Sequence, residues 1–301
     1  MIALIDGDIL IYRAGYAAQK THYRFLHRDG SVIDFDKRTK IQVEKELKSL
    51  GYSQAHGKLQ KLISPDPIEN ACHTVKLMVT DILNSTKATD FKMYLTANDK
   101  TNYRFDLATT LPYKGNRTQP KPLHYDALRE YLIEYWKAEV ISDKEADDEM
   151  GIQADFHSVI CTIDKDLDMI PGMHYNFVTH ELYRTSDPGE LDLVNNRKKL
   201  RGGGLKWFYA QLLLGDSADN IEGIPGYGPV AVYETLYTAQ DELDMCERVL
   251  KVYEKTHKES GFGRLLENAD LLWIQRNPDE RKSEHLKQLV GGLDDKVSVF
   301  G

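Results

Sequence analysis

The fold is decided by the stretch Ile2-Ala-Leu-Ile5, which runs directly into Asp6-Gly-Asp8. A short apolar run that ends at a turn is typical of a buried strand. The same pattern, again ending in acids, recurs at residues 91–99 and at residues 158–166. Residues 138–141 repeat it before a fourth acidic cluster. The sequence therefore predicts four strands that each lead into carboxylates.

Helical patterns separate these strands. Apolar residues recur at helical spacing over residues 69–86, as at Val75 and Val79, and a second such stretch covers residues 124–137. Strands that alternate with helices predict an α/β fold with a mostly parallel sheet covered on both faces. Because such a sheet binds ligands at the carboxyl ends of its strands, we expect the acidic strand ends to converge. A single acid of this kind would more simply be a solvated turn carboxylate.

Composition limits the classes of protein that fit. The chain has 301 residues, 41% hydrophobic and 29% charged, which suffices for one large domain or two smaller ones and excludes disorder and collagen. Its 39 basic and 47 acidic side chains leave a net charge of -8, which excludes a uniformly basic nucleic-acid coat. The acid surplus is either a solvated surface or a concentration of acids around a metal.

The three cysteines, Cys72, Cys161 and Cys246, are far apart and odd in number, so they suggest neither a disulfide framework nor a thiolate zinc site. A reducing compartment is the natural interpretation. The first apolar run is too short for a signal peptide, and no run is long enough to cross a bilayer. We expect a soluble, cytoplasmic protein, in the host cell cytoplasm if it is encoded by a phage.

The fourth acidic cluster lies at residues 142–149. Ser142 and Glu145 fit a capping box, in which a single acid would suffice. Glu145, Asp147 and Asp148 instead crowd like charges, which raise one another's pKa unless a cation balances them. Both interpretations remain open at this point.

Two regions stand apart from this pattern. Residues 20–36 predict a hairpin with its turn at Asp29-Gly30, and this insertion has no predicted function. Residues 37–66 are polar and mixed, and they predict a loose excursion from the core. A basic run and three glycines at residues 197–204 indicate a soft boundary. We predict a core domain at residues 1–203 and a helical subdomain at residues 204–301.

The most specific motif is at residues 214–231, which include Gly-Ile-Pro-Gly-x-Gly. Gly223, Gly226 and Gly228 allow positive φ and close approach of a partner, and Pro229 suits the first turn of a helix. Between two helices this pattern predicts a helix-hairpin-helix at about residues 205–237, which holds a DNA backbone without reading bases. The alternative is an ordinary glycine-rich connection.

The order of motifs resembles the 5′-nuclease superfamily, the flap endonucleases and 5′→3′ exonucleases with a PIN-like core, and is most similar to its bacteriophage exonuclease members. The resemblance covers about two thirds of the chain, residues 1–15 and 90–237. It rests on motifs that occur in the family's order: Asp6; Asp99 followed by Arg104 and Tyr113-Lys114-x-x-Arg117; Glu145-x-Asp147-Asp148; Asp164-Lys-Asp166; and Gly215-Asp216-x-x-Asp219-Asn220.

The resemblance implies two divalent cations, Mg²⁺ or Mn²⁺, for which carboxylate oxygens are suitable ligands. One cation would be held by Asp6, Asp99, Glu145 and Asp147. The second would be held or supported by Asp164, Asp166, Asp148, Asp216 and Asp219. It also implies that Lys114, Arg117 and Arg104 face the scissile phosphate, and that residues 99–125 form a reduced arch.

The expected substrate is duplex DNA with 5′ ends, flaps or gaps, or an RNA–DNA hybrid, cleaved from the 5′ end by a protein that is a monomer by default. The predicted DNA-binding residues come from the glycine motif and the basic run: Gly223, Gly226, Tyr227, Gly228, Lys198, Lys199 and Arg201. A K⁺ ion at the helix-hairpin-helix belongs to the same expectation. The basic run by itself is equally consistent with a solvated linker.

Two other functions fit part of the sequence. A haloacid-dehalogenase-like phosphatase would use Asp6 as nucleophile and Asp8 as acid, but it leaves the glycine motif unexplained. A non-catalytic DNA-structure-binding protein would use the glycine motif and leave the acids inert. The near-complete acidic set argues against this loss of catalysis, and the phosphatase also leaves Asp216 and Asp219 unexplained.

Overall fold

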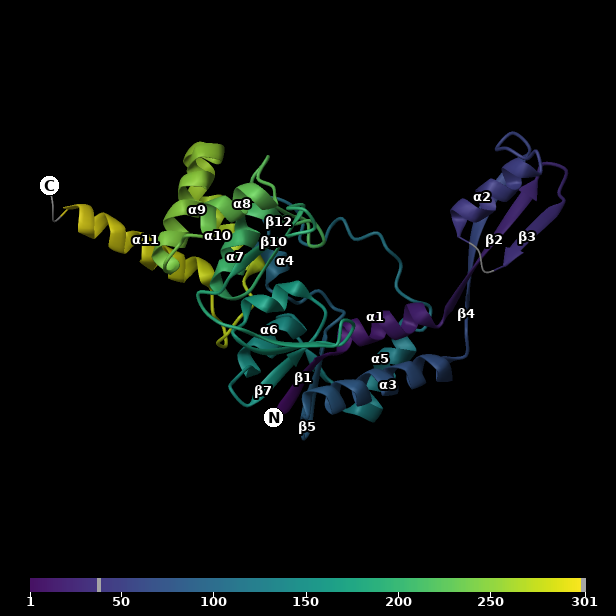
Figure 1. Ribbon diagram of the computed structural model, residues 1–301, viewed down its shortest axis with the longest axis horizontal. Helices are drawn as coiled ribbons and strands as arrows, with labels where there is room; N and C mark the ends of the chain where they lie inside the picture. Colours follow the sequence, from purple (N-terminus) through teal and green to yellow (C-terminus); the bar gives the residue numbers. More distant parts are fainter. Residues whose placement is uncertain (37–38, 299–301) are drawn as a thin grey trace. The chain divides into compact units, whose positions relative to one another are not determined.

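The computed structural model describes residues 1–36 and 39–298, with side chains described up to Gly291. The chain forms two compact units (Figure 1). Unit 1 contains residues 1–8, 80–119 and the segment that follows residue 136. Unit 2 contains residues 9–79 and 120–136.

Unit 1 is built on a six-stranded sheet in the order β6-β5-β1-β7-β8-β9. All neighbouring pairs are parallel except β8 and β9. The strands are β1 (Ile2–Asp6), β5 (Asp90–Thr96), β6 (Glu139–Ile141), β7 (Ser158–Cys161), β8 (Gly172–Asn176) and β9 (Glu181–Thr185). The mostly parallel α/β prediction is confirmed, and so are the four predicted strands.

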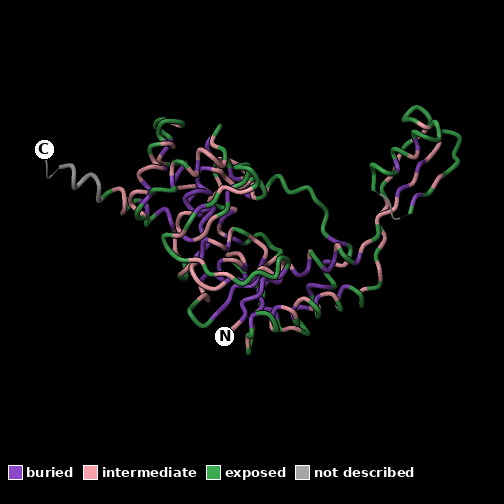
Figure 2. Tube along the Cα trace, in the orientation of Figure 1, coloured by how far each residue is buried: buried purple, intermediate pink, exposed green. Residues whose placement is uncertain are grey.

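Strand β1 lies inside the sheet because its side chains are apolar on both faces. Ala3, Leu4 and Ile5 are almost completely buried, as expected for a strand between two parallel neighbours. Figure 2 shows the chain coloured by burial. Helix α6 (Ala146–Gln153) packs against β1 and β5. A 3₁₀ turn, η1 (Lys165–Met169), follows β7 and packs against α7 (Gly204–Leu214).

The carboxyl-terminal part is mainly helical, as predicted. After α7 come α8 (Pro229–Leu236), α9 (Glu242–His257), the 3₁₀ turn η2 (Lys258–Ser260), α10 (Gly261–Leu272) and α11 (Lys282–Ser298). A small hairpin, β12 (Gly215–Asp216) and β13 (Ile221–Glu222), connects α7 to α8. One buried cluster contains Leu4 and Met150 together with Phe208 and Leu265. This cluster contains residues from both sides of residue 203, and the division into domains at that residue stays a prediction.

Along the chain, a second hairpin of unit 1 lies between β9 and α7. It pairs β10 (Leu191–Val194) with β11 (Lys199–Gly202). The predicted arch region contains one short helix, α4 (Arg104–Leu107), and is otherwise irregular. Its role as an arch stays a prediction.

Unit 2 contains the insertion. Its sheet has the order β3-β2-β4, with β2 (Gln19–His27), β3 (Val32–Asp36) and β4 (Gly57–Pro65), all antiparallel. The predicted hairpin is confirmed. Residues 37 and 38 of the predicted loose excursion lie outside the described residues. From residue 39 onward the prediction is wrong, because α2 (Lys40–Ser49) and β4 complete a small folded module whose core includes Val43 and Leu47.

The remaining helices are α1 (Gly7–Ala17), α3 (Ile68–Thr86) and α5 (Tyr125–Trp136). The last two match the helices predicted for residues 69–86 and 124–137. Within the described part of the chain, none of the helices is both long and apolar enough to span a membrane.

Candidate active site

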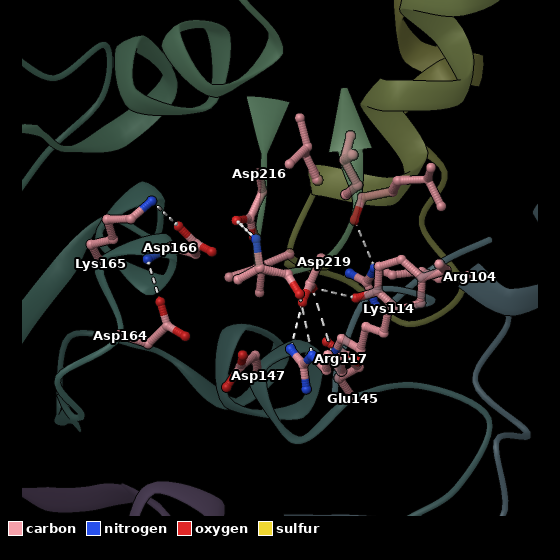
Figure 3. Close-up of a pocket in the computed structure, with 16 residues that line it drawn as sticks. Arg104, Lys114, Arg117, Glu145, Asp147, Asp164, Lys165, Asp166, Asp216 and Asp219 are labelled. Atoms are coloured by element: carbon pink, nitrogen blue, oxygen red, sulfur yellow. Dashed lines mark hydrogen bonds and ion pairs between the residues drawn. The ribbon is translucent and has the colours of Figure 1, made fainter. Parts of the chain in front are cut away.

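Acids from three motifs meet in one cavity of unit 1, with a volume of about 180 Å³ (Figure 3). Two come from the start of α6, two from the start of η1 and two from the β12–β13 hairpin. They are Glu145, Asp147, Asp164, Asp166, Asp216 and Asp219. Four cations also line this cavity, which we call the acidic pocket: Arg104, Lys114, Arg117 and Lys165.

Two further predicted ligands differ in their position. Asp6 is 3% exposed at the end of β1, where it accepts a hydrogen bond of 2.7 Å from Thr162 Oγ1. Its charge raises the pKa of Asp147, so the two acids are electrostatic neighbours. Asp99 is exposed in the loop after β5 and accepts a hydrogen bond of 2.8 Å from Thr101 Oγ1. Neither is among the residues that line the pocket.

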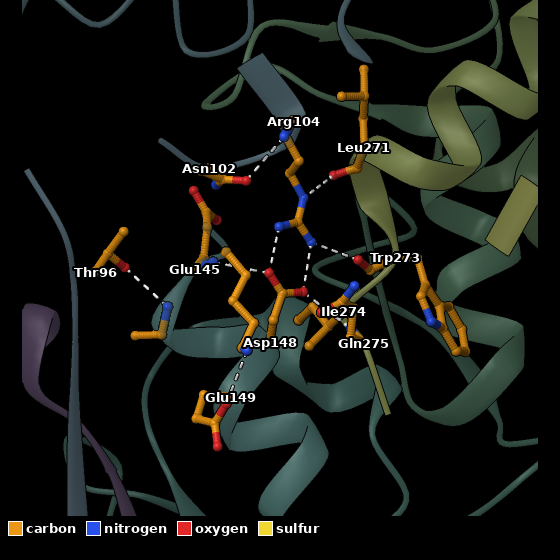
Figure 4. A network of polar contacts seen from close by, with 12 residues as sticks. Thr96, Asn102, Arg104, Glu145, Asp148, Glu149, Leu271, Trp273, Ile274 and Gln275 are labelled. Carbon is orange, nitrogen blue, oxygen red and sulfur yellow. Dashed lines mark hydrogen bonds and ion pairs between the residues drawn. The ribbon is translucent and has the colours of Figure 1, made fainter. Parts of the chain in front are cut away.

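Asp148 and Arg104 form a buried ion pair beside the pocket (Figure 4). The guanidinium binds both carboxylate oxygens, at 2.5 and 2.8 Å, and the two side chains are 0% and 3% exposed. Arg104 also donates to the carbonyl oxygens of Leu271 and Trp273. Most donors of this guanidinium are therefore bound to protein acceptors and do not point at a ligand.

The carboxylate of Asp148 is similarly occupied. It accepts hydrogen bonds of 3.0 Å from the backbone N–H groups of Glu145 and Gln275. The first of these closes the start of α6, and the second ties the segment after α10 to the same helix. The geometry therefore favours a positioning role for Asp148 and Arg104 over the predicted metal-binding and catalytic roles.

Lys114 and Arg117 point into the acidic pocket from the loop after α4. Lys114 is paired with Glu145, and its Nζ lies 3.7 Å from Asp219 Oδ2. Arg117 Nη2 lies 2.5 Å from Asp219 Oδ1. The loop is anchored to the β12–β13 hairpin, since Lys114 N donates to Asp219 O at 2.8 Å and Asn116 Nδ2 donates to Ser217 O.

The carboxylates of the pocket perturb one another. Burial raises the pKa of Asp147 well above its ordinary value, and the charges of Asp6, Asp164 and Glu145 raise it further. Burial and Asp164 likewise raise the pKa of Asp166 to about 7. Burial would also raise the pKa of Glu145, but Lys114 holds it below its usual range. The pocket therefore contains more negative charge than its own cations balance.

In donor type and charge, these residues fit a hard divalent cation. Six carboxylates share the pocket with three cations other than the Asp148-bound Arg104. Among the residues that the structure describes, no three acidic, His or Cys side chains are arranged to hold a metal ion as they stand. Three of these carboxylates are instead paired with cations of the pocket: Glu145 with Lys114, Asp219 with Arg117 and Asp166 with Lys165.

The predicted helix-hairpin-helix segment consists of α7, the β12–β13 hairpin and α8. Gly215 and Gly223 approach each other so closely that a side chain on either would meet backbone. Gly226, with φ of +81°, and Gly228, which caps α8, face open space. Tyr227 packs against the core cluster, so its ring supports the turn. Whether the segment binds DNA stays a prediction.

The predicted basic run is exposed on the β10–β11 hairpin. Lys198, Lys199 and Arg201 are all exposed. Lys199 and Arg201 line a second cavity of about 340 Å³, whose wall includes Lys165 from the acidic pocket. The basic run and the acidic pocket are thus linked through one shared residue.

Sequence reasoning did not assign three residues that now belong to the site. Lys165 Nζ lies 3.1 Å from Asp166 Oδ1, and Gln211 Nε2 donates to the same oxygen at 2.5 Å. Tyr113 OH donates to Asp219 Oδ2 at 2.8 Å. Lys165 and Tyr113 lie within quoted motifs, which is the signal that could have identified them. Gln211 lies in an apolar helix and carried no such signal.

The structure bears on two alternatives, the Ser142 capping box and the phosphatase that uses Asp8. The Ser142 capping box is wrong, since α6 begins after Glu145 and its cap interaction comes from Asp148. Asp8 accepts a hydrogen bond of 2.9 Å from Thr96 N, and it does not line the acidic pocket. It therefore joins the start of α1 to the end of β5, and the geometry offers no support for a phosphatase that needs Asp8 as its acid.

Comparison with known proteins agrees with the motif order. The chain is 25% identical over 185 residues to the flap endonuclease Xni of Shewanella pealeana, which covers 58% of this chain and 70% of that protein. The Xni protein of Shewanella halifaxensis is also 25% identical, over 183 residues, 58% of this chain and 71% of that protein. No model of a protein family matches the chain.

A mutant of the T5 5′-exonuclease shares the fold, with a TM-score of 0.50 and 12% sequence identity over 96% of this chain and 98% of that one. Sequence similarity and fold thus point in the same direction as the order of the acidic motifs. The chain is thus similar in sequence to two proteins named flap endonucleases and similar in fold to the T5 5′-exonuclease.

Proposed function

We propose that the protein is a divalent-metal-dependent 5′-nuclease that hydrolyses phosphodiester bonds of DNA from the 5′ end, as a 5′→3′ exonuclease or flap endonuclease. The observation that carries this proposal is the acidic pocket, where six carboxylates meet Lys114 and Arg117. The order of the acidic motifs in the chain resembles that of the 5′-nuclease superfamily. The two Xni proteins to which the chain is similar are named flap endonucleases.

We assign the cation-binding role to the carboxylates that line the pocket, together with Asp6, whose charge raises the pKa of Asp147. When bound, a divalent cation such as Mg²⁺ or Mn²⁺ supplies Lewis-acid polarisation of the scissile phosphate. The raised pKa values of Asp147 and Asp166 support this assignment, because crowded carboxylates are stabilised by a cation. Asp99, which is exposed in its loop, is the weakest member of the predicted set.

Lys114 and Arg117 are proposed to bind the scissile phosphate. Both are held at the pocket by the anchored loop, and both are paired with carboxylates of the proposed cation site. Neutralisation of those carboxylates leaves both cations available to an anionic substrate. Their positive charge then stabilises the negative charge that develops on the phosphate oxygens in the transition state.

Arg104 and Asp148 are proposed to position the site. They hold the first turn of α6, which carries Glu145 and Asp147, against the segment that follows α10. Their role is to keep two pocket carboxylates in place.

DNA beyond the reacting phosphate is proposed to contact Gly226, Gly228 and the exposed basic run of the β10–β11 hairpin. The backbone N–H groups at the start of α8 favour a phosphate, and Lys199 and Arg201 add positive charge. A K⁺ ion at the same turn, an RNA–DNA hybrid as substrate and a monomeric state complete the proposal.

Labelled duplexes test this function. A duplex labelled at the 5′ end and one labelled at the 3′ end are incubated with Mg²⁺, with Mn²⁺ or with a chelator. We expect release of the 5′ label first, and no cleavage with the chelator. Digestion that begins at 3′ ends, or cleavage that survives the chelator, would overturn the proposal. Flap, nick, gap and RNA–DNA hybrid substrates then identify the preferred structure.

A further inference from the structure

The insertion in unit 2 differs in charge from the rest of the chain. Residues 19–66, which we call the insertion module, contain ten Lys and Arg and six Asp and Glu. The remaining residues contain 29 basic and 41 acidic side chains. The module is therefore basic within an acidic protein, and a basic surface favours an anionic partner.

The module is a folded two-layer unit. Helix α2 packs on one face of the β3-β2-β4 sheet, and the buried side chains between the layers include Phe25, Phe35 and Leu47. Thr39 caps α2 through hydrogen bonds between its own groups and those of Gln42. A surface on this unit is consequently held in shape by a core of its own.

A cavity of about 540 Å³ lies between α2 and the loop that leads into β4. Its apolar wall consists of Phe25, Leu47, Tyr52 and Leu59. The volume falls in the usual range for small-molecule sites, and it is about three times that of the acidic pocket. The cavity can therefore admit a group with a flat ring.

Tyr52 is held by other aromatic rings. Its ring centroid lies 4.6 Å from His27 in an edge-to-face arrangement, 5.7 Å from Phe25 and 6.1 Å from His56. Such contacts restrict the Tyr52 ring before a ligand arrives. An oriented aromatic ring at the wall of an open cavity is a suitable stacking partner for a nucleobase.

Two exposed lysines stand at the same cavity. Lys40, at the start of α2, and Lys58, on β4, both line it. Glu44 lies 3.6 Å from Lys40 and is the acid of the cavity wall. The cavity thus combines an apolar aromatic wall with positive charge at its edge, which matches a base attached to a phosphate backbone.

We propose that the insertion module binds single-stranded nucleic acid, with one unpaired base stacked on Tyr52 and the adjacent phosphates bound by Lys40 and Lys58. This inference rests on the proposed nuclease function, because that function brings nucleic acid to the chain. A single strand is favoured over a duplex, since the bases of a duplex are already stacked on one another and cannot enter a cavity.

The test uses the full-length chain, in chelator so that no cleavage occurs, and a short fluorescein-labelled oligo(dT) as the probe. Binding is measured by fluorescence anisotropy. The variants are Lys40→Gln with Lys58→Gln, and separately Tyr52→Leu, which keeps an apolar side chain. The matched control is Lys45→Gln with Lys48→Gln, two exposed lysines of α2 that lie outside the cavity wall.

We expect each cavity variant to weaken binding about tenfold, and the control pair to change it much less. Equal weakening by the cavity and control pairs would overturn the proposal, since it would indicate diffuse attraction alone. Unchanged binding in the cavity variants would overturn it too, as would a loss of duplex binding in these variants as large as their loss of single-strand binding.

A second measurement locates the base. Oligo(dT) substituted with 5-iodouracil is irradiated with the full-length chain, and the cross-linked peptide is identified by mass spectrometry. We expect the peptide that contains Tyr52; cross-links confined to unit 1 would contradict the proposal. Cleavage of a short duplex with Mg²⁺ is measured in parallel. If the unsubstituted chain does not cleave the duplex, the proposed nuclease function is wrong. The binding of oligo(dT) by the cavity variants tests the insertion module separately.

Discussion

Two ion pairs of unit 1 take their acids from the same motif and differ in how accessible they are. Arg104 and Asp148 are 3% and 0% exposed, and backbone groups take up most of their other hydrogen-bonding positions. Lys114 and Glu145 are 18% and 13% exposed and line an open pocket. Asp148 lies only three positions after Glu145, yet Glu145 faces a ligand site and Asp148 lies in the core.

The difference shows how burial assigns a role to a charged residue. A buried ion pair with its hydrogen bonds satisfied can contribute to structure, whereas removal of one partner leaves an uncompensated charge. An accessible pair at a pocket can exchange its partner for a ligand. The comparison predicts different outcomes for similar substitutions, and five experiments can test it.

The largest effect is expected in the pocket itself. Asp164→Ala with Asp166→Ala removes two carboxylates that crowd the proposed cation site. Cleavage of a labelled duplex should fall by about 10³-fold or more, because charge stabilisation at the phosphate is lost. Duplex binding in chelator should be kept or improved, since repulsive charges are removed. Asp192→Ala on exposed β10 is the control, and cleavage at the original rate would show that the site is misplaced.

The buried pair should respond through stability. Arg104→Ala leaves Asp148 charged in the core, so the free energy of unfolding should fall by about 3–5 kcal/mol. Urea denaturation followed by circular dichroism measures this. Arg197→Ala, which breaks the exposed pair with Glu234, should cost much less. Equal losses for both variants would remove the distinction between a buried and an accessible pair.

The accessible pair should respond through rate. Lys114→Met removes a cation proposed to face the phosphate, so kcat should fall by about 10²–10³-fold. The melting temperature should change little, because the lysine is partly exposed and its backbone anchor to Asp219 is kept. Lys251→Met on the exposed face of α9 serves as control. A large fall in stability with unchanged kcat would assign Lys114 to structure.

A smaller effect is expected at the turn before α8. Gly228 has ordinary φ and open space around its Cα, so Gly228→Asp should fold and supply a favourable helix cap. Its carboxylate should repel a phosphate at this helix start and weaken duplex binding about tenfold. Gly263→Asp, also in open space, is the matched control. If the two variants bind duplex equally well, the proposed contact at α8 is wrong.

The smallest effect concerns a buried histidine outside the pocket. Burial lowers the pKa of His174, whose Nε2 lies 2.8 Å from Ile170 O. Below pH 6.5 the unfolded chain gains a proton that the folded chain resists, so the free energy of unfolding should fall as pH drops through this value. Urea denaturation between pH 7.5 and 6 checks the slope, at most about 1.4 kcal/mol per pH unit. His174→Gln should flatten it; an identical slope would exclude His174 as its source.

The sequence predicted the sheet because its information was local. The buried strands are short apolar runs, so β1, β5, β6 and β7 could be recognised from their own residues. The fold of residues 39–66 was predicted wrongly for the opposite reason. Its helix buries only Val43 and Leu47 deeply, and its last strand gains order by pairing with β2, a partner that no local pattern reveals.

The sequence by itself determined the mostly parallel sheet, the order of the acidic motifs and the excess of carboxylates over cations. These depend on residue type and spacing along the chain. Only the tertiary structure decided that Asp147 enters the pocket while Asp148 binds Arg104, that Lys165 and Gln211 join the site, and that Tyr52 faces a cavity. These features depend on burial and on partners that are distant in the sequence, because the environment of a charged or aromatic side chain is set by the packing around it.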